Sequence, residues 1–343
     1  MFFSIWPSQR IHAALAGGAI ACDAPVQPGQ IQPASLDLRL GPRAYRVPAS
    51  FLPGPGRPVM ERLEHLSTHE VDLTRPVVLE RNCVHIVPLM ERLRLPPGVN
   101  ARANPKSSSG RLDIFVRIIV DGGSTFDEIP EGYEGPLYAE VVPRSFPVIA
   151  VAGARLAQIR FRDIAVEATG ARRTVPVTID LDPAGKECGI VGYRARRTSG
   201  IVDLARSGAL RRSDFWEPIV MDGERRELVL DPDEFYILSS AEAVAVGAME
   251  AAEMVAYDTA VGELRSHYAG FLDPGFGLEE AGGAGSRIVL EIRSHDVPFL
   301  LDHGQRIATL LYEPMAARPD RLYGQGLGSS YQGQGLKLSK HFA

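Results

Sequence analysis

Cysteine is scarce in this chain of 343 residues, and its spacing excludes two kinds of protein. The three cysteines are Cys22, Cys83 and Cys188, and no two of them form a C-x-x-C pair. A disulfide framework needs an even set of cysteines, and a cysteine-rich zinc site needs closely spaced pairs. We therefore expect neither of these, and we expect a reducing, cytoplasmic location.

Long apolar runs and a strong net charge are also lacking. No run reaches the roughly 18 apolar residues that a transmembrane helix requires, so no membrane span is predicted. The 37 basic and 42 acidic residues give a net charge of −5, which provides no general attraction to polyanions. We therefore expect neither a nucleic acid polymer nor a membrane as a partner.

Glycine and proline are plentiful, with 34 and 26 residues, and they separate short runs of β-forming residues. The predicted strands cover residues 83–87, 115–120, 175–180, 235–238 and 287–292. Short strands between Gly/Pro-rich turns are typical of a β sandwich or barrel. Helical patterns are few, and they cover residues 8–15, 202–207 and 248–254. The predicted fold class is therefore mainly β, with a few short helices.

The two halves of the chain repeat one another. An offset of 151 residues aligns Glu140 with Glu291 and Arg155 with Arg306, and it aligns nearby prolines, glycines and alanines as well. A constant offset across strand-like segments predicts two copies of one β unit, and the chain is longer than a single core usually fills. The expected division is a first unit, a junction or insert, and a second unit, over residues 1–165, 166–200 and 201–343.

The first unit contains a polar turn that suits phosphate binding. It runs from Lys106 through three serines and Gly110 to Arg111. Hydroxyl groups, free backbone N–H groups and two cations bind phosphate oxygens well. A turn of this composition, taken alone, is more often only a polar surface turn.

The second unit carries Glu291 inside an otherwise apolar run. An ionisable group at a core position is costly unless it is paired or functional, and burial raises a carboxyl pKa toward that of a general base. An ordinary salt bridge to an arginine is the other interpretation of Glu291. The glycine-rich segment from Tyr323 to Lys340 is either an arm that orders over a ligand or a disordered terminus.

In this order and spacing, the motifs resemble those of the dCTP deaminases in the dUTPase-like superfamily. The matching segments run from Ile31 to Gly41, Ser107 to Arg111, Ala269 to Phe276, Ile288 to Glu291 and Tyr331 to Gln334. The resemblance implies two tandem dUTPase-like units, each a distorted β-barrel or jelly roll, in a homo-oligomer with active sites between neighbouring units. It also implies hydrolytic deamination of dCTP to dUTP and ammonia, on a triphosphate that carries Mg²⁺, for dUTP and dTTP supply.

The zinc motifs of other nucleobase deaminases are missing from the sequence. Those enzymes need H-x-E and P-C-x-x-C, and neither occurs here. The eight histidines also form no H-E-x-x-H spacing. A general base must then activate the attacking water without zinc, and the resemblance identifies Glu291 as that base.

The two units differ in which motif they keep. The first keeps Ser-Ser-x-x-Arg, whereas the second has Ala256 to Ala260 at the equivalent place. The second keeps Asp273-Pro-Gly-Phe, whereas the first has Pro130-Glu-Gly-Tyr. In the family the two motifs come from different subunits that meet at the site. We therefore hypothesise one working site built from complementary halves, with Glu140 as a relic or a structural acid.

The resemblance also implies roles for individual residues. Glu291 is the expected base. Arg111 and Ser107 are expected to hold the water and stabilise the tetrahedral intermediate. Asp273 is expected to accept a hydrogen bond from the sugar 3′-hydroxyl. The other expected substrate-binding residues are Lys106, Ser108, Ala269, Phe271, Phe276, Tyr331, Gln334, Lys337 and Lys340. Backbone near residue 269 would read the base edge, and the tail would close over the triphosphate.

Two other functions stay open at this point. A bifunctional enzyme of the same fold would continue to dUMP and pyrophosphate, with Asp121 or Asp273 directing water at the α-phosphate. A catalytically dead homologue would bind the nucleotide without turnover. The apolar strand around Glu291 favours deamination.

Overall fold

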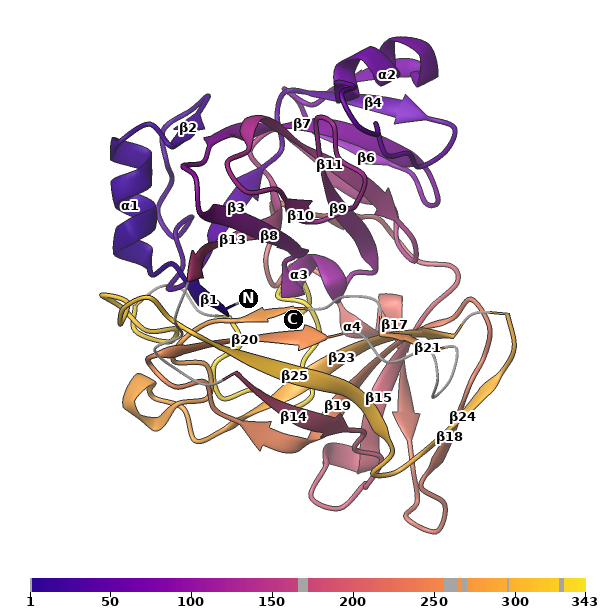
Figure 1. The fold of residues 1–343 in the computed structure, drawn as a ribbon. Coiled ribbons are helices and arrows are strands. Elements are labelled where there is room, and N and C mark those ends of the chain that lie inside the picture. Colours follow the sequence, from indigo (N-terminus) through magenta and orange to yellow (C-terminus); the bar gives the residue numbers. More distant parts are fainter. Residues whose placement is uncertain (1, 166–171, 256–263, 267–269, 295, 327–329) are drawn as a thin grey trace.

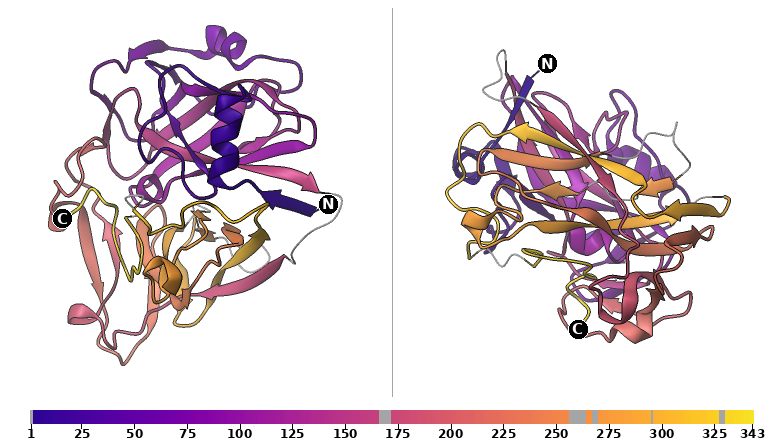
Figure 2. Two further views of the ribbon diagram at one scale, coloured as in Figure 1. Left: turned by 90° about the vertical axis from the view of Figure 1, so that its left-hand side faces the viewer. Right: turned by 90° about the horizontal axis from the view of Figure 1, so that it is seen from below.

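The computed structural model describes residues 2–165, 172–255, 264–266, 270–294, 296–326 and 330–343 (Figure 1). Its two units lie one above the other, the first in indigo to magenta and the second in pink to yellow. The left view of Figure 2 shows the same stacking from another side, and in the right view, from below, the two units overlap. In the described part of the chain, no helix is long and apolar enough to cross a membrane.

Two sheets form most of the first unit. One contains β1 (Phe2–Ile5), β3 (Leu36–Arg39), β8 (Val99–Pro105), β10 (Glu128–Ile129) and β13 (Arg155–Ala165). The other contains β2 (Ile20–Cys22), β4 (Arg43–Val47), β5 (His69–Asp72), β7 (Val84–Arg94), β9 (Ile114–Val120) and β11 (Glu134–Pro143). Alternate residues of these strands point inward, and Leu38, Val87 and Phe161 are buried in the shared core. The helices are α1 (Ser8–Ala16), α2 (Val59–Leu66) and the single turn α3 (Ser107–Gly110).

The second unit is built in the same way. One sheet contains β14 (Arg173–Thr178), β20 (Glu250–Val255), β22 (Phe271–Leu272) and β25 (Arg306–Pro314). The other contains β15 (Ile190–Ala195), β17 (Trp216–Val220), β19 (Phe235–Val244), β21 (Leu264–Ser266) and β23 (Ser286–Ser294). Smaller sheets join β6 (Val77–Leu79), β12 (Val148–Ala150) and β16 (Val202–Asp203), and β18 (Glu227–Leu230) with β24 (Phe299–Asp302). The short helical segments are α4 (Arg212–Phe215), η1 (Glu187–Gly189) and η3 (Glu279–Ala281).

The strand pairing follows the repeat that the sequence predicts. The pairs β7–β11, β8–β13 and β6–β12 of the first unit reappear as β19–β23, β20–β25 and β18–β24. The register agrees as well, because Arg39 lies opposite Arg155 and Thr178 lies opposite Arg306. The predicted mainly β fold is therefore confirmed, and every predicted strand segment overlaps a strand.

Three details of the sequence prediction need correction. Of the predicted junction 166–200, the described residues 172–200 include β14 and β15, which pair within the sheets of the second unit and do not form a separate insert. Residues 202–207 begin as the short strand β16, which pairs in parallel with β12 of the first unit. The alanine-rich stretch 248–254 is mostly β20, since burial of Ala251 and Ala252 between paired strands outweighs helix propensity. The predicted helix at 8–15 is confirmed as α1.

Charged and aromatic contacts join the two units. Arg102 Nε of β8 lies 3.2 Å from Glu253 Oε1 of β20, at the equivalent position of the repeat. Arg293 of β23 pairs with Asp113, which follows α3, and both side chains are buried. The C-terminal Phe342 packs against Trp216, with ring centroids 5.9 Å apart. These contacts fix α3 of the first unit against β23 of the second (Figure 1).

Candidate active site

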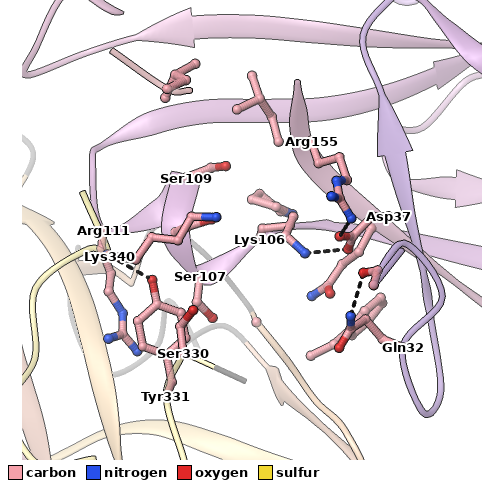
Figure 3. A pocket seen from close by; sticks show the side chains of 18 of the residues that line it. Gln32, Asp37, Lys106, Ser107, Ser109, Arg111, Arg155, Ser330, Tyr331 and Lys340 are labelled. Carbon is pink, nitrogen blue, oxygen red and sulfur yellow. Dashed lines mark hydrogen bonds and ion pairs between the residues drawn. The ribbon is translucent and has the colours of Figure 1, made fainter. Parts of the chain in front are cut away.

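A cavity of about 640 Å³ opens between the two units. The first unit contributes β3, α3 and the start of β13, the second contributes β22, the loop after it and β23, and the C-terminal tail closes one side. Figure 3 shows Ser107, Arg111, Tyr331 and Lys340 at one end of the cavity. Lys106, Asp37 and Arg155 lie at the other end.

Arg111 joins α3 to the tail. Its side chain is buried, Nη1 donates to the Lys337 carbonyl at 2.9 Å, and Nη2 donates to Gln334 Oε1 at 2.9 Å. The Tyr331 ring lies 3.9 Å from the guanidinium carbon, a cation–π contact. Ser339 Oγ donates to the Ser108 carbonyl at 2.8 Å, so α3 holds the tail at a second point.

Glu291 lies on β23 and faces the cavity from the second unit. Burial raises its pKa well above the ordinary value, the nearby Asp113 charge raises it further, and Arg111 lowers it. Among the described residues, no group donates a hydrogen bond to this carboxylate. Gly110 lies directly against it, because a Cβ built on Gly110 would be 2.7 Å from Glu291 Cδ. The structure therefore brings a buried carboxyl group against α3.

Asp273 follows β22 and is paired across the unit boundary. Arg160 Nη2 of β13 donates to Asp273 Oδ1 at 3.0 Å, and both side chains are nearly inaccessible. Burial raises the pKa of Asp273, and the Arg160 charge acts in the opposite direction. The same guanidinium lies 4.1 Å from the Phe271 ring centroid. Arg160 thus fixes both the carboxylate and the aromatic ring in the cavity wall.

The other predicted residues fall into three groups. Lys106, Ser107, Ser108, Phe276, Tyr331, Gln334 and Lys340 also line the cavity. The Lys337 ammonium instead donates to the Ser330 carbonyl at 2.7 Å, so this residue meets Arg111 through its backbone. Ala269 and the second-unit counterpart 256–260 lie outside the described residues.

Two further acids named from the sequence have structural partners. Glu140 is buried, and its Oε1 accepts from Arg117 Nη2 at 2.6 Å and from Nε at 3.0 Å. Asp121 Oδ1 accepts from the Val59 backbone at 2.7 Å, at the start of α2. Neither carboxylate lies among the residues that line the cavity.

Sequence reasoning missed three charged residues of the site. Asp37 lies inside the Ile31–Gly41 motif, and Arg155 belongs to the repeat, but neither was given a role. Arg160 lies in an alternating strand pattern in which one more arginine carries no signal. Its importance depends on its contact with a residue 113 positions away.

Family models and known proteins agree with these observations. Residues 3–165 match the model of the 2′-deoxycytidine 5′-triphosphate deaminase N-terminal domain, and residues 154–342 match that of the C-terminal domain. The chain is similar to the crystal structure of 2′-deoxycytidine 5′-triphosphate deaminase from Agrobacterium tumefaciens, with 48% identity and a TM-score of 0.86. That match covers 93% of this chain and all of the other.

Two curated relatives match part of the chain. Both carry the name "dCTP deaminase, dUMP-forming". The protein from Methanosphaera stadtmanae is 27% identical over 153 residues, which cover 42% of this chain and 71% of the relative. The protein from Halobacterium salinarum is 32% identical over 122 residues, which cover 34% of this chain and 57% of the relative.

Proposed function

Since the chain belongs to the 2′-deoxycytidine 5′-triphosphate deaminase family, we propose that it hydrolyses dCTP to dUTP and ammonia in the cavity between its units. The position of Glu291 is the observation that carries the proposal. Its carboxyl group is buried, faces α3, and has a raised pKa. A raised pKa makes the carboxylate a stronger proton acceptor, as a general base must be.

Glu291 and Arg111 divide the chemistry. Glu291 takes a proton from water as the water oxygen bonds to C4 of cytosine, which gives a tetrahedral intermediate. The protonated Glu291 then passes that proton to N4, so that the C4–N4 bond breaks with release of ammonia, and the proton of the new C4 hydroxyl moves to N3 to give uracil. Arg111 and the Ser107 hydroxyl stabilise the charge that develops beside them. The tail residues fixed on Arg111 exclude bulk water from this step.

The remaining residues orient the nucleotide. Asp273, held by Arg160, accepts a hydrogen bond from the 3′-hydroxyl of the sugar, and Phe271 packs beside the sugar. Lys106 and Lys340 bind the triphosphate. In the described part of the chain, no cluster of three or more His, Cys, Asp or Glu side chains could hold a metal ion. This donor set fits a Mg²⁺ ion that arrives on the phosphates and keeps their oxygens and water as ligands.

The test replaces Glu291 and its repeat counterpart by glutamine. We expect E291Q to lower kcat for ammonia release by about 100-fold or more, the usual effect of losing a general base, with dCTP binding retained. E140Q is the matched control, because Glu140 is equally buried but is paired with Arg117; we expect its turnover to stay near that of the parent protein. Full activity in folded E291Q would refute the assignment.

A dUMP-forming activity is the second candidate, because both curated relatives carry that name. Of the two acids considered for that step, Asp121 binds the start of α2, and Asp273 is neutralised by Arg160. Neither carboxylate is therefore placed to direct water at the α-phosphate, which favours release of dUTP. Separate measurement of ammonia and pyrophosphate from dCTP and from dUTP distinguishes the activities, since only the bifunctional enzyme yields pyrophosphate.

A catalytically dead homologue would bind dCTP in an equilibrium assay and release no ammonia. The base, the guanidinium and the tail lie together within one chain, which favours an active enzyme. The same arrangement supports a site that is complete within one chain. We propose a homo-oligomer in the cytoplasm whose sites are each complete within one chain, and sedimentation analysis with and without dCTP tests the assembly.

A further inference from the structure

One end of the cavity holds a charge cluster around Asp37. Lys106 Nζ pairs with one carboxylate oxygen, and Arg155 Nη1 lies 3.5 Å from the other (Figure 3). The Asp37 side chain is 3% exposed, whereas those of Lys106 and Arg155 are 21% and 29% exposed. The carboxylate is therefore buried behind two cations that both line the cavity.

Cations outnumber acids at this end of the cavity. Lys340 lines the same cavity from its other end, and its pKa is lowered first by burial and then by the charges of Lys106 and Arg155. The charges of these three cations thus act on one another, whereas Asp37 pairs with only two of them and Asp273 is paired with Arg160. A ligand with several negative charges would relieve this repulsion, and the exposed donors of the cations would bind its oxygens.

The internal repeat shows whether Arg155 is needed for the fold or for binding a ligand, because the second unit has an equivalent arginine. Arg306 begins β25 as Arg155 begins β13, and each follows a turn with a glycine at positive φ, Gly304 and Gly153. Arg306 is exposed, and its Nη2 donates to Thr309 Oγ1 at 2.6 Å. The same strand start therefore carries an arginine in both units, but the arginine of the first unit lines a cavity.

We propose that Arg155 and Lys106, held around Asp37, form the subsite for the terminal phosphates of the nucleotide, and that Arg155 makes the enzyme prefer triphosphates to monophosphates. This inference rests on the proposed function. The planar guanidinium presents paired donors that match phosphate oxygens, which a lysine at the same place would not reproduce fully. Asp37 acts as a positioning residue that holds both cations at the wall.

The experiment compares dCTP with dCMP as substrates of the full chain. We expect R155Q to raise KM for dCTP about tenfold, with kcat within about twofold, because one charge-assisted contact is lost. The ratio of kcat/KM for dCTP over dCMP then falls by the same factor. R155K should recover part of the preference, and R306Q should match the parent protein.

Two outcomes overturn the proposal or separate it from the proposed function. If R155Q folds and keeps the dCTP preference within about twofold, Arg155 does not bind the terminal phosphates. Inorganic tripolyphosphate provides a readout without turnover, since it should raise the melting temperature of the parent protein and R306Q more than that of R155Q. If the parent releases no ammonia from dCTP while this difference persists, the proposed function fails and the phosphate subsite stands.

Discussion

Gly110 is the most sensitive position for testing the geometry of the site. It is the last residue of α3, and its Cα lies against the Glu291 carboxylate. Alanine usually stabilises a helix by about 1 kcal/mol relative to glycine, so G110A should be harmless if the two units were not in contact there. We expect the opposite result.

The magnitude follows from the distances. A Cβ on residue 110 would lie 2.7 Å from Glu291 Cδ and 2.9 Å from Oε1, and closer still to Oε2. Non-bonded carbon contacts are about 3.5 Å or longer, so the carboxylate has to retreat by about 1 Å. A displacement of that size costs about 100-fold in rate. The added methyl group should also destabilise the fold by about 1–3 kcal/mol through overpacking.

The assay combines steady-state ammonia release with urea unfolding. G200A is the control, because a Cβ there meets Phe215 Cζ at 3.4 Å, an ordinary contact. A double-mutant cycle shows whether the effect passes through the base: once Glu291 is glutamine, G110A should cost little further activity. Folded G110A with the parent kcat would show that Gly110 and Glu291 do not meet in solution.

Two further predictions concern buried carboxylates. Because burial raises the pKa of Glu291 above its ordinary 4.5, the folded state holds this proton more tightly than the unfolded state. The parent protein should therefore lose stability relative to E291Q as pH rises above about 4.5, by about 1.4 kcal/mol per pH unit until the raised pKa is passed. If urea unfolding gives the same difference in free energy of unfolding between the two proteins across this range, the burial of Glu291 is contradicted. D273N should destabilise the fold by about 3 kcal/mol, because it leaves the buried Arg160 guanidinium without its counter-charge. Equal denaturation midpoints for D273N and the parent would argue against the ion pair.

Local pattern predicted the fold well where residues alternate along one strand. The apolar runs of β9 and β23 are buried in the two units, and the offset of 151 residues located their paired neighbours. Pattern failed at β20, where Ala251 and Ala252 suit a helix in isolation. Their conformation is determined by β25 and β22 on either side, which are distant in sequence.

Only those site residues that belong to a recognisable motif could be predicted from the sequence. Arg111 and Glu291 stand out in the sequence because each occupies a recognisable motif. Arg160 and Arg155 do not, since their roles depend on which partner the fold brings near. A contact between residues far apart in sequence leaves no local pattern, so the pairing of Arg160 with Asp273 had to come from the structure.

The repeat also explains why two equivalent glutamates differ in chemistry. Glu140 and Glu291 occupy the same place in β11 and β23, and both are buried. In the first unit, Arg117 of β9 lies opposite Glu140 on the neighbouring strand and donates twice to one oxygen. This ion pair holds the Glu140 carboxylate within its own sheet, and Glu140 is not among the residues that line the cavity. Glu291 instead lies against α3 of the other unit, where Gly110 has no side chain to displace its carboxylate, and no described residue donates a hydrogen bond to it.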